Sequence, residues 1–335
     1  MSRRLWLLLA VIGVVVMILV IVAVLLNDRL QSDPLQLSDA NDGLAFISNR
    51  DGPWDIFYLN AAGEVINLTN GAANEHDYFA SWSLDGTAIN FLSNRAGQMG
   101  PAQVKPAEGT VRTLNPVQAL TQMLNEGLTD WDPAWSPTGV MGYASLANGL
   151  AVNLDLYLLP ERDAERERLT SDGPGGPNDW FLAWEPTADR FAYNSNRGGD
   201  ENIYLMDPAS GEITQLTDNP ADDVHAAWSM DGDTILFVSE RDAALFDGEL
   251  RLYLMDADGD NQRPFAAENT VFTGDPVHSA NGEQVAYMSN ESGHWHIYVM
   301  DADGENIQQV TDGDADFLFP AWRPIPQSTA NTIED

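Results

Sequence analysis

A short module with a tryptophan near its centre recurs through this chain, and it restricts the possible folds more than any other feature. The module reads FASWSLDG at residues 79–86 and AAWSMDG at residues 226–232. Its anchor position is occupied in turn by Trp82, Trp135, Trp184, Trp228, His278 and Trp322. Neighbouring anchors stand 44 to 53 residues apart, and a repeat of that length is typical of proteins assembled from similar supersecondary units.

Each repeat predicts four short β-strands. The anchor segment supplies the first, and an apolar run that ends near Ser-Asn-Arg follows, as in INFLSNR at 89–95. An alternating segment such as NIYLMD at 202–207 comes next, and the last strand ends in Leu-Thr or Val-Thr. β-Branched and aromatic residues at alternate positions suit strands that pack face to face between neighbouring sheets. The pattern therefore predicts an all-β propeller built from four-stranded blades.

The two ends of the repeat region determine the number of blades. Residues 44–69 contain the second to fourth strands of a blade without a first strand, whereas residues 317–323 form a first strand without successors. Pairing the two halves closes the ring and removes exposed strand edges. We therefore predict a six-bladed propeller over residues 42–324, with one blade shared between the chain ends and a flexible C-terminal tail at 325–335.

Several repeats resemble those of a known family. The segments PAWSPTG (133–139), SNRGGDENIYLMD (195–207) and MDADGENIQQVTDGDADFLFPAW (300–322) are similar to the repeat of TolB-like, WD40-like β-propellers. The resemblance implies the fold and leaves the function open, because related propellers serve as protein-binding scaffolds, as gating domains of serine peptidases and as metal-dependent pectin lyases. We expect neither the α/β domain that precedes the propeller of TolB nor a peptidase domain, and the sequence has no Gly-x-Ser-x-Gly nucleophile elbow.

The loops of such blades fall on two faces, which we call the tight face and the variable face. The tight face carries the short turns between strands one and two and between strands three and four, and the variable face carries the other connections, which differ in length. Two long connections on the variable face, a predicted short helix at 115–127 and a loop at 241–250, either bind a partner or pack on their own blades. The side chains that would contact a partner are Leu120, Leu124, Leu245 and Phe246.

Aspartates recur three, five or six residues before the anchors, at the entry to the predicted innermost strands. They are Asp77, Asp130, Asp132, Asp179, Asp223, Asp275 and Asp316. At the mouth of the central channel, converging carboxylates would attract a Lys- or Arg-rich peptide, and a divalent cation such as Ca²⁺ is an alternative. A further alternative is that each Asp bonds backbone amides at its own strand entry. We take these residues as candidate partner-binding residues and expect no resident cofactor.

Three aspartates on alternate positions resemble the beginning of a calcium loop. They are Asp256, Asp258 and Asp260. The segment lacks the Gly that such a loop has at position six, where Asn261 stands, and the Glu at position twelve, where Ala267 stands. A similar turn, MDADGEN, recurs at 300–306. We therefore predict a polar turn between strands three and four and assign no metal ligands, with these aspartates as the alternative metal site.

Residues 5–26 predict a membrane-spanning helix. They form a stretch of 22 residues without a charge, and at ~1.5 Å per residue such a helix is ~33 Å long, enough to cross a bilayer. Arg3 and Arg4 precede it, so residues 1–4 are expected in the cytoplasm, and the linker 27–41 and the propeller outside it. The stretch exceeds the apolar region of a cleaved signal peptide. We predict an uncleaved signal anchor in a single-pass bacterial membrane protein, with the propeller in the periplasm or at the cell exterior.

The charge of the chain restricts its partners. The net charge is −35, with 51 acidic against 16 basic side chains. A field of that sign repels nucleic acid and attracts cations and basic peptides, and it also suits a salt-adapted surface. Cysteine is absent and there are five histidines, which excludes thiolate metal sites and disfavours an imidazole metal centre. We predict a monomeric, non-catalytic protein- or peptide-binding scaffold, with a metal-dependent carbohydrate lyase or hydrolase and a cation-stabilised structural scaffold as alternatives.

Overall fold

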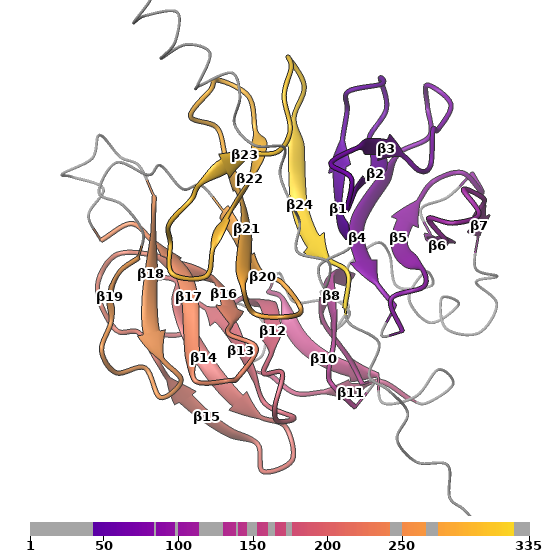
Figure 1. Cartoon of the computed structure of the whole chain (residues 1–335). Coiled ribbons are helices and arrows are strands. Elements are labelled where there is room, and N and C mark those ends of the chain that lie inside the picture. Colours follow the sequence, from indigo (N-terminus) through magenta and orange to yellow (C-terminus); the bar gives the residue numbers. More distant parts are fainter. Residues whose placement is uncertain are drawn as a thin grey trace, which may run out of the picture.

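The described part of the chain is a six-bladed propeller (Figure 1). The computed structural model describes residues 43–83, 85–97, 100–113, 130–138, 140–145, 153–159, 165–171, 176–241, 250–265 and 274–324. These residues form six antiparallel sheets of four strands each. The predicted all-β architecture of six four-stranded blades is therefore confirmed.

The blades are numbered along the chain, and the strands of each are given from first to fourth. Blade 1 contains β24 (Phe317–Trp322), β1 (Gly43–Ser48), β2 (Asp55–Asn60) and β3 (Val65–Asn67). Blade 2 contains β4 (Asp77–Trp82), β5 (Ile89–Ser93), β6 (Gly100–Val104) and β7 (Val111–Thr113). Blade 3 contains β8 (Asp130–Trp135), β9 (Met141–Ser145), β10 (Asp155–Leu159) and β11 (Glu167–Arg168).

Blade 4 contains β12 (Asp179–Trp184), β13 (Phe191–Ser195), β14 (Asn202–Asp207) and β15 (Glu212–Gln215). Blade 5 contains β16 (Asp223–Trp228), β17 (Thr234–Ser239), β18 (Arg251–Asp256) and β19 (Arg263–Pro264). Blade 6 contains β20 (Gly274–His278), β21 (Gln284–Ser289), β22 (His296–Asp301) and β23 (Gln308–Gln309).

Blade 1 combines strands from opposite ends of the described chain. Strand β24 pairs antiparallel with β1, with Trp322 opposite Leu44 and Phe317 opposite Ser48. Figure 1 shows the yellow β24 beside the indigo β1. Blade 1 packs on its neighbours through two apolar clusters, which contain Phe46 and Phe57 on one side and Ile47 and Ile56 on the other. These two sets of side chains alternate along β1 and β2, as expected for a strand buried on both faces.

The turns of the tight face need residues that tolerate a left-handed backbone. Between β18 and β19, Gly259 has a φ of 89° and Asn261 a φ of 56°. The amide of Asp256 donates to the carbonyl of Asp260, and the Asn261 amide group donates to the Asp256 carboxylate at 2.6 Å. The segment therefore forms the predicted polar turn.

The anchor tryptophans hold neighbouring blades together. In four seams, the indole N–H donates to the carbonyl of the penultimate residue in the first strand of the preceding blade. The bonds are Trp82 to Ala321 (3.0 Å), Trp184 to Ala134 (3.2 Å), Trp228 to Ala183 (3.1 Å) and Trp322 to Val277 (3.1 Å). These four rings are also buried, and Trp228 packs in one cluster with Ile203 and Leu205 of blade 4. Each anchor thus contributes apolar burial and a directed hydrogen bond between blades.

Some predicted elements lie outside the described residues. They are the helix 5–26 with residues 1–4, the linker 27–41, the tail 325–335, and the side chains Leu120, Leu124, Leu245 and Phe246. In the ranges that the structure describes, no helix is long and apolar enough to cross a membrane.

We expect Trp228→Phe to lower the free energy of unfolding by about 2 kcal/mol, because the substitution removes the bond to Ala183 and part of a buried ring. Trp180→Phe is the matched control, since the half-buried Trp180 donates to Glu201 within its own blade; we expect a smaller loss there. Urea denaturation of the full-length chain measures both values. Equal losses would show that the bond between blades adds nothing.

Candidate functional site

Three of the aspartates that begin an inner strand lie inside their blades. Each is 0% exposed and forms an ion pair with an arginine 18 residues later. The pairs are Asp77 with Arg95 (2.7 Å), Asp179 with Arg197 (3.0 Å) and Asp223 with Arg241 (2.7 Å). Each arginine follows the last serine of the second strand by two residues, so its side chain reaches back to the start of the first strand. These carboxylates are counter-ions within the blades, and their part in ligand binding stays a prediction.

The remaining predicted aspartates occupy other environments. Asp130 begins β8 at the equivalent place, but its side chain is outside the description. Asp316 precedes β24 on the variable face, where its Oδ1 accepts from the Trp295 amide at 3.1 Å and lies 3.5 Å from His294 Nδ1. The backbone amide in this contact is the kind of partner that the strand-entry alternative predicts.

Every inner strand contains a β-bulge at one shared position. In all six blades the pairing with the second strand skips, so that two residues of the first strand oppose one residue of the second. The first of these two residues stands three positions before the anchor and has a left-handed backbone in five blades. The φ angles are 57° at Phe79, 48° at Phe181, 56° at His225, 48° at Asp275 and 55° at Phe319.

The bulge changes which side chains face the axis of the propeller. A left-handed backbone costs about 1–2 kcal/mol per residue for non-glycine residues, and bulges re-aim side chains. The second bulged residue is proline in three blades, namely Pro133, Pro276 and Pro320. Proline fits there because the bulge interrupts the ladder, so no strand hydrogen bond is lost.

Residues at and beside the bulges line a central cavity of about 200 Å³, with contributions from β4, β12, β16, β20 and β24. Phe79 and Phe319 have ring centroids 5.8 Å apart, and Phe181 lies 4.1 Å from His225 in the same measure. Asp275 lies 2.6 Å from His225 through its Oδ1 and the imidazole Nδ1. The cavity therefore combines three phenyl rings with one carboxylate–imidazole pair.

The predicted acidic residues thus fall into two groups, those five or six before the anchor and those three before it. Asp275 lines the cavity, and Asp132 holds the same place in the bulge of β8. In the sequence, the residues around the cavity can be recognised by their position three before the anchors. The carboxylates five before the anchor drew attention because of their charge, and Phe79, Phe181 and Phe319 were missed because they are apolar.

No metal centre is apparent in the described ranges. There, no group of three or more His, Asp or Glu side chains is arranged to hold a metal ion. Within the turn between β18 and β19, the Asp258 carboxylate accepts from the Asp260 amide at 3.1 Å, and the Asp256 carboxylate accepts from Asn261. Both carboxylates therefore stabilise the turn itself.

Comparison with known proteins identifies the family. A model of the TolB beta propeller domain matches residues 132–325, more than half of the chain. The chain belongs to the TolB beta propeller family. Its fold agrees with TolB from Acinetobacter baumannii at a TM-score of 0.64, with 18% identity over 86% of this chain and 68% of that one. A chain of the nidogen/laminin complex superposes at 0.57, with 8% identity over 84% of this chain and 98% of that one. At these identities the likeness shows the fold alone.

Two curated relatives of this TolB-family chain have no established role. An uncharacterized protein of Agrobacterium fabrum is 26% identical over 181 residues, which are 50% of this chain and 57% of the relative. The uncharacterized peptidase YuxL of Bacillus subtilis is 25% identical over 180 residues, which are 54% of this chain and 24% of that protein. The chain spans less than two thirds of the length of either relative.

We expect Arg241→Met to lower the free energy of unfolding at pH 7 by about 3 kcal/mol, because it leaves the buried Asp223 carboxylate without its cationic partner. Burial raises the pKa of Asp223, whereas the Ser239 hydrogen bond and the Arg241 charge lower it. Without Arg241 the pKa rises further, so the folded state binds the proton more tightly than the unfolded state. The deficit is therefore greatest above the folded pKa and shrinks as the pH falls through it.

Urea denaturation of the full-length chain at pH 7 and pH 5 measures this dependence. Arg112→Met is the matched control, because Arg112 is 62% exposed and pairs with Glu108 at the surface; we expect a change within about 0.5 kcal/mol. A deficit in Arg241→Met that grew toward pH 5 would contradict the assignment.

Proposed function

We propose that this chain is a membrane-anchored, extracytoplasmic propeller that binds a protein or peptide partner by holding a basic side chain in its central channel. The observation that carries the proposal is the environment of Asp275. Its Oδ1 pairs with His225, whereas its Oδ2 is buried and has no hydrogen-bond partner among the described residues. A buried, unpaired carboxylate oxygen is costly, and a cationic donor from a ligand would satisfy it.

The aromatic rings of the cavity favour the same kind of ligand. Phe79, Phe181 and Phe319 are partly buried and line the cavity, and the face of an aromatic ring attracts a cation. Lysine and arginine side chains end in a charge and have an apolar stem. Such a side chain matches a cavity with apolar walls and a carboxylate, and a neutral or acidic side chain does not.

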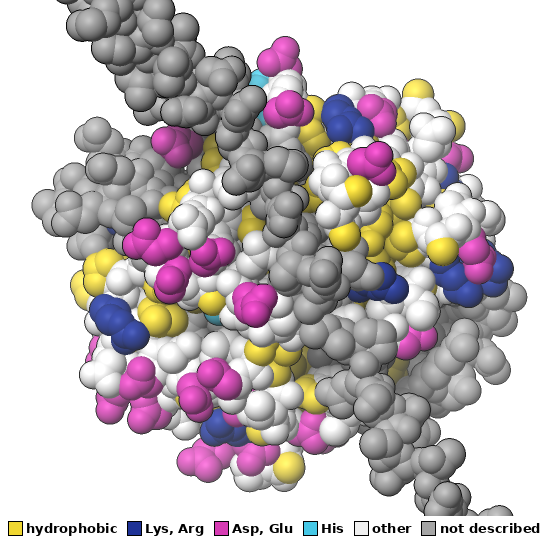
Figure 2. All heavy atoms as spheres, viewed as in Figure 1, with side chains coloured by type: hydrophobic (Ala, Val, Ile, Leu, Met, Phe, Trp, Pro, Cys, Tyr) yellow, Lys and Arg dark blue, Asp and Glu magenta, His cyan; other side chains and the backbone are white. Residues whose placement is uncertain are grey.

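The charge of the whole molecule supports a basic partner. The net charge is −35, and Figure 2 shows Asp and Glu side chains across the visible face with few Lys and Arg among them. A field of this sign raises the rate at which a basic ligand meets the surface. The field supplies attraction from a distance, and the channel supplies the specific contact.

The fold provides support of a general kind for protein binding. Propellers present loops of variable length on a rigid scaffold, which suits recognition. A propeller of similar fold occurs in the nidogen/laminin complex. The predicted helix at 115–127 and the loop at 241–250 would extend the contact around the channel, with Leu120, Leu124, Leu245 and Phe246 as the proposed contact residues.

A hydrolase is the second candidate, and the same pair favours it. His225 and Asp275 have the arrangement in which a carboxylate orients an imidazole for general-base catalysis, and Ser81 lines the same cavity. The two candidates differ in what happens to the bound peptide, because a scaffold releases it intact and a hydrolase releases fragments.

We expect Asp275→Asn to weaken the binding of a lysine peptide about tenfold, because the variant removes the carboxylate that pairs with the ammonium group. The probe is a fluorescein-labelled heptapeptide with one lysine among glycine and serine residues. Fluorescence anisotropy with the full-length chain, at an ionic strength of about 0.15 M to screen distant charges, gives the dissociation constant. Mass spectrometry of the recovered peptide distinguishes binding from hydrolysis.

Two controls separate the channel from the general acidity of the surface. Asp258→Asn makes the same charge change at an exposed position in a tight-face turn, and we expect no effect on binding. Acetylation of the peptide lysine removes its charge and should weaken binding to the wild type as much as Asp275→Asn does. Equal effects of Asp258→Asn and Asp275→Asn would exclude the channel as the site.

The membrane location requires its own test. We expect the full-length chain to remain in the membrane pellet after a sodium carbonate wash, because the uncharged segment 5–26 is long enough to span a bilayer. A variant that lacks residues 5–26 should be released. Addition of a protease to intact spheroplasts should digest the propeller of the full-length chain. Release of the full-length chain by carbonate, or protection of its propeller, would contradict the proposed location.

A further inference from the structure

The seam between blades 5 and 6 departs from the pattern of the four seams with an indole hydrogen bond. Where four blades use a tryptophan to bond the preceding blade, blade 6 has His278. His278 ends β20, and the corresponding carbonyl in the preceding blade belongs to Ala227, the penultimate residue of β16. An imidazole is smaller than an indole, so the substitution leaves space in this seam.

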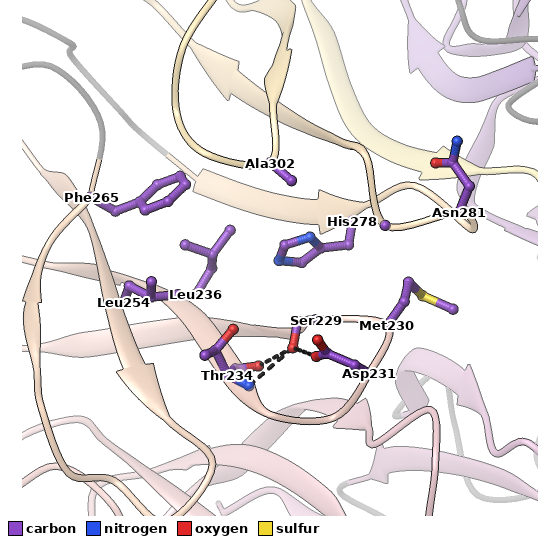
Figure 3. A pocket seen from close by; sticks show the side chains of 11 residues that line it. Ser229, Met230, Asp231, Thr234, Leu236, Leu254, Phe265, His278, Asn281 and Ala302 are labelled. Atoms are coloured by element: carbon purple, nitrogen blue, oxygen red, sulfur yellow. Dashed lines mark hydrogen bonds between the residues drawn. The ribbon is translucent and has the colours of Figure 1, made fainter.

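A cavity of about 470 Å³ lies at this place, between the two blades. Blade 5 contributes Ser229, Asp231, Leu236 and Phe265, and blade 6 contributes His278 and Ala302. Figure 3 shows the imidazole in the middle of the pocket, with Leu236 and Phe265 on one side and the Ser229–Asp231 turn below it. The turns that follow β16 and β20 line this pocket, and both belong to the tight face. The pocket therefore lies on the face opposite the variable loops.

The imidazole of His278 is unsatisfied. Its Nδ1 and Nε2 are both shielded from solvent and have no hydrogen-bond partner among the described residues. Burial lowers the pKa of His278 to about 4, against the opposing charge of Asp231. The ring is therefore neutral at pH 7, with one nitrogen as a donor and the other as an acceptor. A buried acceptor without a partner is a reason for a ligand to bind here.

The Ser229–Asp231 turn of the pocket is held by its own hydrogen bonds. The Ser229 hydroxyl donates to Asp231 at 2.6 Å and accepts from the Thr234 amide at 3.0 Å. The Leu236 side chain opposite is fully buried, and Phe265 is half-buried. The pocket therefore places the apolar side chains Leu236, Leu254 and Phe265 beside an imidazole that lacks hydrogen-bond partners, which suits a flat ring with an N–H donor.

We propose that this seam pocket binds an uncharged aromatic ring that carries one N–H donor, of which indole is the simplest example. The ring would lie in the space that a tryptophan anchor occupies in the four seams with an indole bond, and its N–H would donate to the unprotonated nitrogen of His278. Burial of the ring against Leu236, Leu254 and Phe265 provides affinity, and the imidazole provides selectivity. The ring belongs either to a small molecule or to a tryptophan side chain of a peptide.

The first test compares two ligands of the same shape. Ligand-observed NMR titrations of the full-length wild type measure the dissociation constants of indole and of indene, which lacks the N–H group. We expect indole to bind in the range of about 1 mM and to bind about five- to tenfold more tightly than indene. Absence of indole binding, or equal binding of the two ligands, overturns the proposal.

Two substitutions of His278 test the pocket itself. His278→Trp fills the seam as in the other blades, so we expect at least a tenfold loss of indole binding and an unchanged or higher melting temperature. His278→Leu keeps the pocket but removes the acceptor, so indole should lose its advantage over indene. His294→Leu is the matched control, because the His294 side chain is 46% exposed and should leave binding unchanged.

Additional ligands identify the source of the ring. A pentapeptide with a central tryptophan binds more tightly than free indole if the natural ligand is a side chain, and it is excluded if the pocket admits small molecules alone. Both results keep the ring-binding pocket. Retention of indole binding by His278→Trp overturns the proposed pocket. If that variant does not fold, an unchanged preference for indole over indene in His278→Leu overturns the proposal instead.

Discussion

The bulge shared by the six inner strands is the constraint on which this propeller depends. Regular alternation would direct the side chains of these strands in turn toward the two neighbouring blades, but the bulge inserts one residue and changes what faces the channel. Asp77, Asp179 and Asp223 stand before the bulge and turn into the blades toward arginines. In five blades the residue three before the anchor lines the cavity, as Asp275 and His225 do.

The seams between blades supply the second level of organisation. Four indole N–H groups reach the preceding blade and combine apolar burial with a directed bond. The same rule explains the exception, because the seam with His278 lacks the indole and contains a cavity. A single repeat element thus stabilises the ring where it is tryptophan and opens a pocket where it is histidine. The two proposed sites lie on different parts of the molecule, so each can be tested without the other.

Much of the fold could be predicted from the sequence because the anchors recur at regular spacing. The incomplete repeats at the two ends predicted a blade that combines β24 with β1, and the structure pairs these strands. The bulge could not be predicted, because it depends on how six strands converge around one axis. The Asp–Arg pairs had a signal, a constant separation of 18 residues. That signal was missed because the aspartate begins one strand, whereas the arginine lies beyond the end of the next.

The candidate binding residues stay a prediction. Asp132 and Asp275 were both chosen as acidic residues three before their anchors, whereas the phenyl rings of the channel were missed. An apolar residue in a strand usually belongs to the core, and only the positive φ at Phe79, Phe181 and Phe319 distinguishes these three. The role of His278 in the seam was visible as a departure from the tryptophan repeat, whereas the cavity beside it required the packing of both blades.

Site-specific photo-crosslinking tests most directly whether the channel holds a basic side chain. A benzophenone amino acid in place of Phe181 places the reactive group in the cavity, and the same group in place of Ile213, which is 39% exposed on β15, samples the outer surface. The account predicts that a lysine peptide crosslinks at position 181, that acetylation of the lysine reduces the yield, and that position 213 gives little product. Equal yields at both positions, or a yield at 181 that acetylation leaves unchanged, would contradict it.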